Sequence, residues 1–247
     1  MPSARAVLVH AGLAVLASLV AACGGSTGGG AGSGNTAEQL VALKGHAIYF
    51  GHQSVGHNLM QGVDAWIEAS GDGPRRGGDL ASAGTGWWID GYVGENTKPL
   101  TKLAAFQANV TAHCAQLDIA FVKFCYVDSD WFNGSTQTPA TLLAAYQDMV
   151  AAVHDACPAL QLVHLTMPLQ TSGNAEREQY NDLVRAEYGS KVLDIALLES
   201  TRPDGSRARD GSNVPVLFAD YTDDGGHPNA AASRTLAAAL IAHLAGL

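Results

Sequence analysis

Residues 46–60, HAIYFGHQSVGHNLM, join a short apolar run to a serine flanked by glycines and then to a helical pattern. The run at 46–50 is rich in aromatic and β-branched residues, which is typical of a buried strand. Ser54 then stands at the expected start of a helix over 55–69, where serine is a preferred N-cap. The same position places its hydroxyl beside the free N–H groups of a helix N-terminus. The stretch therefore predicts a strand–turn–helix unit in which Ser54 is a cap, a nucleophile, or both.

The rest of the chain repeats this alternation of strand and helix. Strands are predicted at 46–50, 118–124, 161–166 and 191–196, and helices at 55–69, 99–115, 139–156, 175–188 and 229–246. Such alternation favours a mainly parallel sheet covered by helices on both faces. The predicted fold class is α/β, a three-layer α/β/α sandwich with a mainly parallel, flavodoxin-like sheet.

In an open parallel sheet, ligands bind at the edge formed by the loops that leave the carboxyl ends of the strands. Those loops are GHQSVG (51–56), CYVDSDWFNGST (125–136) and MPLQTSGN (167–174), and DYTDDGGHPN (220–229) is expected to reach the same edge. The side chains that carry chemistry are therefore expected in these segments.

The segment DDGGHPN carries an aspartate and a histidine three residues apart, Asp224 and His227, just before the last predicted helix. A tight turn through the two glycines would bring the carboxylate onto one imidazole nitrogen and leave the other free as a general base. Alternatively, Asp224 shapes a turn and His227 is a surface residue. The motif alone leaves both interpretations open.

Together, Ser54 and the Asp224–His227 pair resemble the SGNH/GDSL hydrolase superfamily, whose members carry a nucleophilic serine after the first strand and a DxxH pair before the last helix. The order of the residues agrees, and the resemblance extends over most of residues 46–246. It implies the SGNH hydrolase fold. It further implies that Ser54 is the nucleophile, His227 the general base and then acid, and Asp224 the residue that orients His227.

The resemblance is weaker at the oxyanion hole. DGYVGENT (90–97) resembles the block that supplies a glycine N–H, with Gly94 as the matching residue, but the family's oxyanion asparagine corresponds to Val127. Loss of one oxyanion donor costs about 100- to 1,000-fold in rate. Asn96 is therefore the first expected replacement and Lys123 the second. The alternatives are that Asn96 caps a turn and that Lys123 snorkels to the sheet edge.

The block around Ser54 also departs from the family, because HQS stands where GDS is usual and Gln53 replaces an aspartate. His52 and His57 flank Ser54, but no nearby carboxylate completes a metal-binding HxH or HxxxH set. His52 is expected to pack or to donate a hydrogen bond from behind the site. The sequence predicts no metal and no cofactor.

Three tryptophans, Trp87, Trp88 and Trp131, fall in loops predicted to approach the site. Exposed indole faces suit sugar rings, such as those of an acylated polysaccharide. The alternative is that these side chains cover the end of the sheet, as large aromatics commonly do.

Residues 1–22 have the layout of an export signal, with one basic residue, Arg5, before a mostly apolar run. The run ends in VAAC, which resembles the bacterial lipobox, so Cys23 is expected to be lipidated and to anchor the protein to a membrane. An ordinary secretory signal is the alternative. Residues 23–36 are rich in glycine and serine and are expected to form a flexible tether. Residues 37–247 are expected to form the hydrolase domain.

The net charge of the 247-residue chain is −9 and its basic residues do not cluster, which argues against a nucleic-acid partner. Cys114 and Cys157 each end a predicted helix before a predicted strand, so they lie at the same rim of the sheet. A disulfide between them is expected in an oxidising compartment. Reduced, packed thiols, with Cys125 as the third, are the alternative.

These features predict a lipid-anchored serine esterase that deacylates a small ester, such as an acetyl group on a carbohydrate, in the cell envelope. Two alternatives remain. One is an inactive SGNH-like protein that binds a glycan or a protein, motivated by Val127 and Gln53. The other is an acyltransferase with the same triad.

Overall fold

The computed structural model describes residues 33–247. The predicted signal peptide, Cys23 and most of the predicted tether lie outside these residues. The first helix, α1 (Ser33–Leu43), begins inside the predicted tether. Thr36, Leu40 and Leu43 are buried, the two leucines in one apolar core with residues of the last helix. Burial of these side chains explains why residues 33–36, predicted as part of the tether, belong to α1.

The described residues form one six-stranded sheet and seven α-helices. The strands are β1 (Ile48–His52), β2 (Arg75–Arg76), β3 (Trp87–Tyr92), β4 (Ile119–Val122), β5 (Gln161–Leu165) and β6 (Val192–Leu193). The remaining α-helices are α2 (Ser54–Ser70), α3 (Pro99–Ala112), α4 (Pro139–Ala156), α5 (Ala175–Tyr188), α6 (Ile195–Ser200) and α7 (Ala230–Ala245). Short 3₁₀ helices are η1 (Leu80–Ser82), η2 (Cys114–Gln116), η3 (Tyr126–Trp131), η4 (Gly189–Lys191) and η5 (Ala219–Tyr221). No helix among residues 33–247 combines the length and the apolar character needed to cross a membrane.

The strands follow the order β2-β3-β1-β4-β5-β6, and every neighbouring pair is parallel. Strand β1 lies between β3 and β4, with Ile48 in register with Trp88 on one side and Ile119 on the other. The carboxyl ends of these three strands are therefore adjacent, which places the loops that follow them around one point of the sheet edge.

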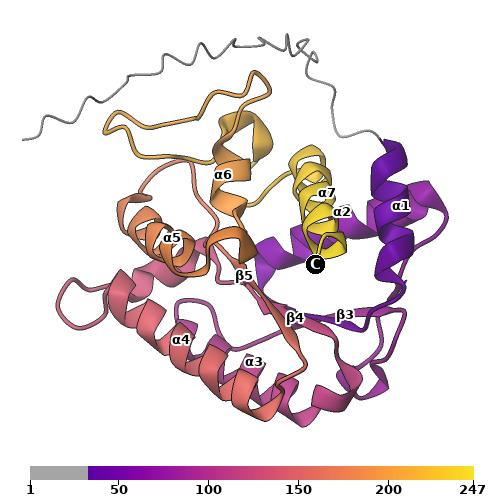
Figure 1. The fold of residues 1–247 in the computed structure, drawn as a ribbon. Coiled ribbons are helices and arrows are strands. Elements are labelled where there is room, and N and C mark those ends of the chain that lie inside the picture. Colours follow the sequence, from indigo (N-terminus) through magenta and orange to yellow (C-terminus); the bar gives the residue numbers. More distant parts are fainter. Residues whose placement is uncertain (1–32) are drawn as a thin grey trace, which may run out of the picture. The chain divides into compact units, whose positions relative to one another are not determined.

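Helices cover both faces of the sheet, as Figure 1 shows with α3 and α4 on one side and α1 and α7 on the other. One core joins α1, α2 and α7 to side chains such as Phe50 and Phe121, whose rings stack 4.5 Å apart. The other core joins α3, α4 and α5 to Tyr49, which stacks on Phe106. The predicted three-layer α/β/α sandwich is confirmed.

The sheet differs from the sequence prediction at β6, which is shorter than predicted, and at β2 and β3, which the sequence does not predict as strands. The predicted strand over 191–196 shrinks to β6, because Asp194 accepts a hydrogen bond from Leu197 N (2.9 Å) and caps α6 instead. Trp87 and Trp88, predicted in loops near the site, open strand β3 at its amino end. They therefore lie at the amino edge of the sheet, opposite to the edge where Ser54 is found, and Trp88 is fully buried. Trp131 ends η3 and is partly buried.

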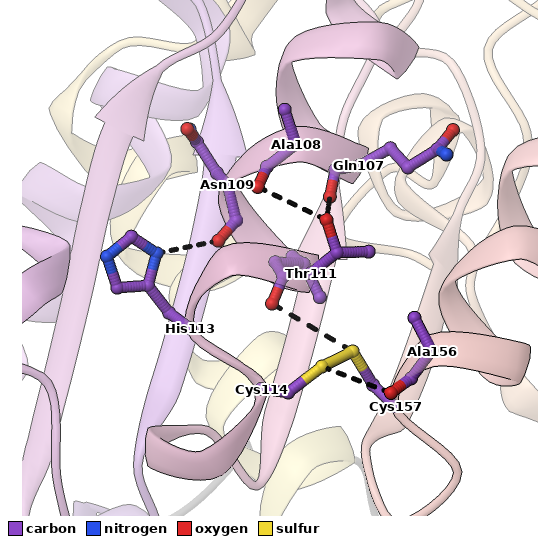
Figure 2. Close-up of a disulfide and its surroundings, with 9 residues drawn as sticks. Gln107, Ala108, Asn109, Thr111, His113, Cys114, Ala156 and Cys157 are labelled. Carbon is purple, nitrogen blue, oxygen red and sulfur yellow. Dashed lines mark hydrogen bonds between the residues drawn. A yellow bond between two sulfur atoms is a disulfide. The ribbon is translucent and has the colours of Figure 1, made fainter.

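Cys114 and Cys157 form a disulfide with a Cα–Cα distance of 5.5 Å, the pairing that the sequence predicts. Figure 2 shows the bond between the segment that ends α3 and the segment that ends α4. Each cysteine lies a few residues before a strand, β4 and β5 respectively, so the bond is at the amino edge of the sheet. Cys125 is the free cysteine of the described residues and is buried.

Candidate active site

Ser54 is the first residue of α2 and follows the end of β1 with only Gln53 between them, so the helix begins one residue before the predicted start. The N-cap is Gln53, whose carbonyl oxygen accepts from Gly56 N (2.8 Å) and His57 N (3.2 Å). The first turn of the helix is thus closed by backbone groups, and the Ser54 hydroxyl is not its cap. That hydroxyl is free to bond elsewhere.

The side chains of Ser54, His227 and Asp224 form a hydrogen-bonded series. Ser54 Oγ lies 3.0 Å from His227 Nε2, and Asp224 Oδ2 lies 2.6 Å from His227 Nδ1. The second carboxylate oxygen, Oδ1, accepts from His227 N (2.8 Å) and Gly226 N (2.9 Å). These backbone bonds, with the His227 ring, hold the pKa of Asp224 well below its usual value. Asp224 is therefore ionised and fixed against the imidazole.

The turn that carries this pair depends on its two glycines. Gly225 has a φ of +87°, a conformation that residues with a Cβ rarely adopt. Gly226 packs against Tyr126, since a Cβ there would lie 2.7 Å from Tyr126 Cζ. The Tyr126 ring also stands edge-on to the His227 ring, with centroids 5.3 Å apart. Sequence reasoning missed Tyr126, although its place beside Val127 in the expected oxyanion block was a signal.

Gln53 and Gly94 bring a second loop to Ser54. The Gln53 amide donates to Val93 O (3.0 Å) and Gly94 O (2.9 Å). Gly94 has a φ of +57°, and a Cβ there would lie 2.4 Å from Lys102 N. Within the described residues, neither Ser54 N nor Gly94 N donates to another group. Gln53, which stands where the sequence comparison expects an aspartate, therefore holds this loop in place. The loop contains Gly94, the residue predicted to supply an oxyanion N–H.

His52 lies behind the site with both ring nitrogens engaged. Nε2 bonds to Asp90 Oδ2 (2.8 Å) and Nδ1 to Gln53 O (2.9 Å). Burial alone would raise the pKa of Asp90, but the bonds from His52 and Arg76 lower it to about 2. His52 thus supports Gln53 and does not contact Ser54. Residues 33–247 contain no cluster of three or more side chains suited to a metal ion.

Lys123 is almost fully buried and does not snorkel to the sheet edge. Its Nζ donates to Phe124 O (2.8 Å) and lies 3.7 Å from Cys125 Sγ. Burial lowers the pKa of this lysine. The Cys125 thiol lies in turn 3.9 Å from Ser54 Oγ. Lys123 therefore reaches the neighbourhood of Ser54 only through the cysteine.

Val127 lies in the first turn of η3 and offers no side-chain donor. Asn96 is exposed in the loop that follows Gly94, and its Oδ1 accepts from Lys102 Nζ (2.9 Å). Lys102 pairs with Asp128, and both side chains are fully buried. Sequence reasoning missed this pair. The signal was the position of Lys102, which falls with Phe106 and Val110 on the buried face of α3 at four-residue spacing.

No protein-family model matches this sequence, and no curated protein matches it. Solved structures match its fold. A Parabacteroides merdae protein assigned as a GDSL-like lipase gives a TM-score of 0.54 at 10% identity, covering 81% of this chain and 95% of that one. An acetyl xylan esterase, AlAXEase, gives 0.51 at 12% identity, covering 79% and 98%. A Streptococcus pneumonia protein assigned as a platelet activating factor gives 0.50 at 15% identity, covering 86% and 92%.

Proposed function

We propose that this chain, which has the SGNH hydrolase fold, is a divergent serine ester hydrolase of that superfamily. The observation that carries the proposal is the bonded series Ser54 Oγ, His227 and Asp224, with contacts of 3.0 and 2.6 Å. A hydroxyl, an imidazole and an ionised carboxylate in this order are the groups that acyl transfer through a serine requires.

In the first half of the reaction, Ser54 Oγ attacks the ester carbonyl carbon and gives its proton to His227 Nε2. Asp224, bonded to Nδ1, stabilises the imidazolium that forms. His227 then donates the proton to the alkoxide oxygen as the carbon–oxygen bond breaks, so the alcohol leaves and the acyl group stays on Ser54. In the second half, water replaces the alcohol and the same steps run in reverse, releasing the acid.

The negative charge on the carbonyl oxygen during both halves needs donors that are already in place. Among residues 33–247, Ser54 N–H and Gly94 N–H have no hydrogen-bond partner, and Gln53 fixes the Gly94 loop beside Ser54. The N-terminus of α2 adds a positive dipole end at Ser54. The Asn96 amide is the side-chain donor that we propose in place of the family's asparagine.

We propose an acetylated carbohydrate as the substrate class. The similarity in fold to an acetyl xylan esterase supports testing acetylated xylan fragments as the first substrates. We propose Tyr92, and not Trp87 or Trp88, as the aromatic surface for a sugar ring. Tyr92 lies at the carboxyl end of β3, in register with His52, and is 65% exposed. For the location, the sequence at Cys23 supports a lipid anchor in the cell envelope. Loss of the protein from the membrane fraction on Cys23→Ala would be the expected result.

The proposal is tested with protein lacking residues 1–23 and its Ser54→Ala variant. We expect hydrolysis of 4-nitrophenyl acetate and acetylated xylo-oligosaccharides by the wild-type chain only, and labelling of Ser54 by a fluorophosphonate, located by mass spectrometry. Turnover equal to that of Ser54→Ala would reject the esterase and favour a binding protein. Product analysis with a sugar acceptor present distinguishes hydrolysis from acyl transfer.

A further inference from the structure

The Lys102–Asp128 ion pair is the most deeply buried charge pair of the described residues. Lys102 Nζ and Asp128 Oδ2 are 2.5 Å apart, and both side chains are fully inaccessible to solvent. Removing two charges from water is costly, and the pair's attraction offsets that cost only when further hydrogen bonds satisfy both groups. A buried pair of this kind is weak evidence for stability, and its other contacts give it a different role.

Those contacts join the two loops that flank Ser54. Asp128 Oδ2 also accepts from Cys125 N (2.7 Å), in the loop after β4 whose Cys125 thiol is 3.9 Å from Ser54 Oγ. Asp128 Oδ1 accepts from Thr97 N (3.0 Å), in the loop after β3 that holds Gly94. One carboxylate thus fixes the loop that contains Val127 relative to the loop that contains Asn96.

The lysine of the pair acts on Asn96 itself. Lys102 Nζ donates to Asn96 Oδ1 at 2.9 Å, and an ammonium group offers donors and no acceptor. The Asn96 amide therefore cannot flip, because a flip would place its NH₂ group against the ammonium. In the described residues Nδ2 donates to no other atom, and Asn96 is exposed. The contact with Lys102 thus fixes the orientation of the Asn96 Nδ2–H donors, which have no partner among residues 33–247.

The backbone of α3 fixes this loop from the other side. Gly94 lies so close to Lys102 N that a Cβ on the glycine would approach it to 2.4 Å. The glycine that we propose as an oxyanion donor and the lysine that orients Asn96 are therefore packed together. A cation on the amide oxygen also polarises the amide, which makes Nδ2–H a stronger donor.

We propose that Lys102 and Asp128 are positioning residues that hold the Asn96 amide as the side-chain oxyanion donor that Val127 cannot provide. This inference rests on the proposed esterase function. It explains why a charged pair lies buried beneath this loop, and it assigns the two residues a role in the rate of acyl transfer through Asn96.

The test compares Asn96→Ala with Glu95→Ala, a matched truncation of the neighbouring exposed residue, which pairs with Lys98. Two rates are measured, kcat for 4-nitrophenyl acetate and modification of Ser54 by a fluorophosphonate. We expect Asn96→Ala to lower both about 100-fold or more with KM unchanged, and Glu95→Ala to change neither by more than about twofold. Equal rates in wild type and Asn96→Ala would overturn the inference.

Lys102→Met then separates positioning from a structural role. If Lys102 acts through Asn96, Lys102→Met slows the wild-type chain but not the Asn96→Ala chain, since coupled residues are not additive. An equal slowing in both backgrounds would overturn the inference. Should Lys102→Met not fold, ¹⁵N NMR of the Asn96 side-chain amide decides, with a shift expected when the phosphonyl adduct forms on Ser54 and its absence counting against the proposal. Failure to label Ser54 in wild type would instead remove the proposed function as well.

Discussion

His227 Nε2 lies 3.0 Å from Ser54 Oγ although the two residues are 173 positions apart in the chain. The contact follows from the packing of α7 along α2, the most extensive helix pair of the fold. Ser54 opens α2, and His227 lies three residues before α7, so two helix N-termini meet at the carboxyl edge of the sheet. The same helix pair that closes one core therefore sets the distance between nucleophile and base.

The contact between Asp224 and His227 predicts a large effect of Asp224→Asn. The asparagine oxygen would still accept from Gly226 N and His227 N, which preserves the turn, but its NH₂ group would face Nδ1. The proton would then sit on Nε2, which could no longer accept from Ser54. We expect kcat for 4-nitrophenyl acetate to fall about 10⁴-fold with Tm nearly unchanged. The neighbouring exposed residue gives the control, Asp223→Asn, and comparable losses in both variants would contradict the assignment.

Gly226 is the position where the smallest substitution should disturb His227. The methyl group of Gly226→Ala would lie 2.7 Å from Tyr126 Cζ, so the Tyr126 ring or the His227 turn must move. A displacement of about 1 Å in a reacting group costs on the order of 100-fold in rate. We expect that loss in kcat, measured beside Gly211→Ala, where a Cβ meets no atom within 4 Å. Full activity of Gly226→Ala would show that Tyr126 does not hold the imidazole in place.

The long helices were predictable because their apolar spacing matches the faces that they bury. Helices α4 and α5 have the predicted bounds, and α2 and α7 differ from theirs by one residue at each end. The parallel sheet followed from the alternation of helix and strand. The contacts of His227 with Ser54 and Asp224 agree with the sequence prediction, because each motif is local in the sequence and the predicted fold brings both motifs to one edge of the sheet.

The parts that escaped prediction depend on contacts between distant segments. Strand β3, WWIDGY, has no clear alternation, and its strand character comes from pairing with both β1 and β2. The Lys102–Asp128 pair joins α3 to η3 across 26 positions of the sequence, so neither residue alone indicates a partner. The position of Asn96 near Gly94 in the sequence predicts it as the donor, but its contact with Lys102 depends on the packing of α3.

The Cys114–Cys157 disulfide should contribute stability without contributing to activity. The two cysteines are 43 positions apart in the sequence. For a loop of this length, the loss of chain entropy in the unfolded state gives about 4 kcal/mol of stabilisation of the folded protein. The bond lies at the amino edge of the sheet, opposite to Ser54. We expect Cys114→Ala/Cys157→Ala to lower the urea midpoint and leave kcat for 4-nitrophenyl acetate within about twofold at 20 °C. A large loss of kcat in a folded double variant would contradict this prediction, because it would show that the disulfide affects the geometry of the site.

Glu199 should make the stability of the fold depend on pH. Its side chain is 1% exposed on α6, Oε2 accepts from Leu169 N (2.7 Å), and Oε1 has no partner within residues 33–247. Burial raises its pKa to about 8, although Leu169 N–H and the nearby cations Lys123 and Arg177 oppose the shift. The folded state therefore keeps a proton at neutral pH.

An unfolded chain loses the Glu199 proton near its ordinary pKa of about 4.3, whereas the folded chain keeps it to about 8. Between about pH 4 and pH 8, unfolding therefore releases the Glu199 proton. The contribution of Glu199 to the free energy of unfolding is complete below about pH 4 and is lost as the pH rises to 8. Glu199→Gln mimics the protonated form and removes the loss. We expect its Tm to match wild type near pH 4 and to exceed it increasingly up to pH 8, while exposed Glu38→Gln follows wild type throughout. A Glu199→Gln variant that is less stable than wild type at pH 8 would show that the buried carboxyl is ionised and paired with Lys123.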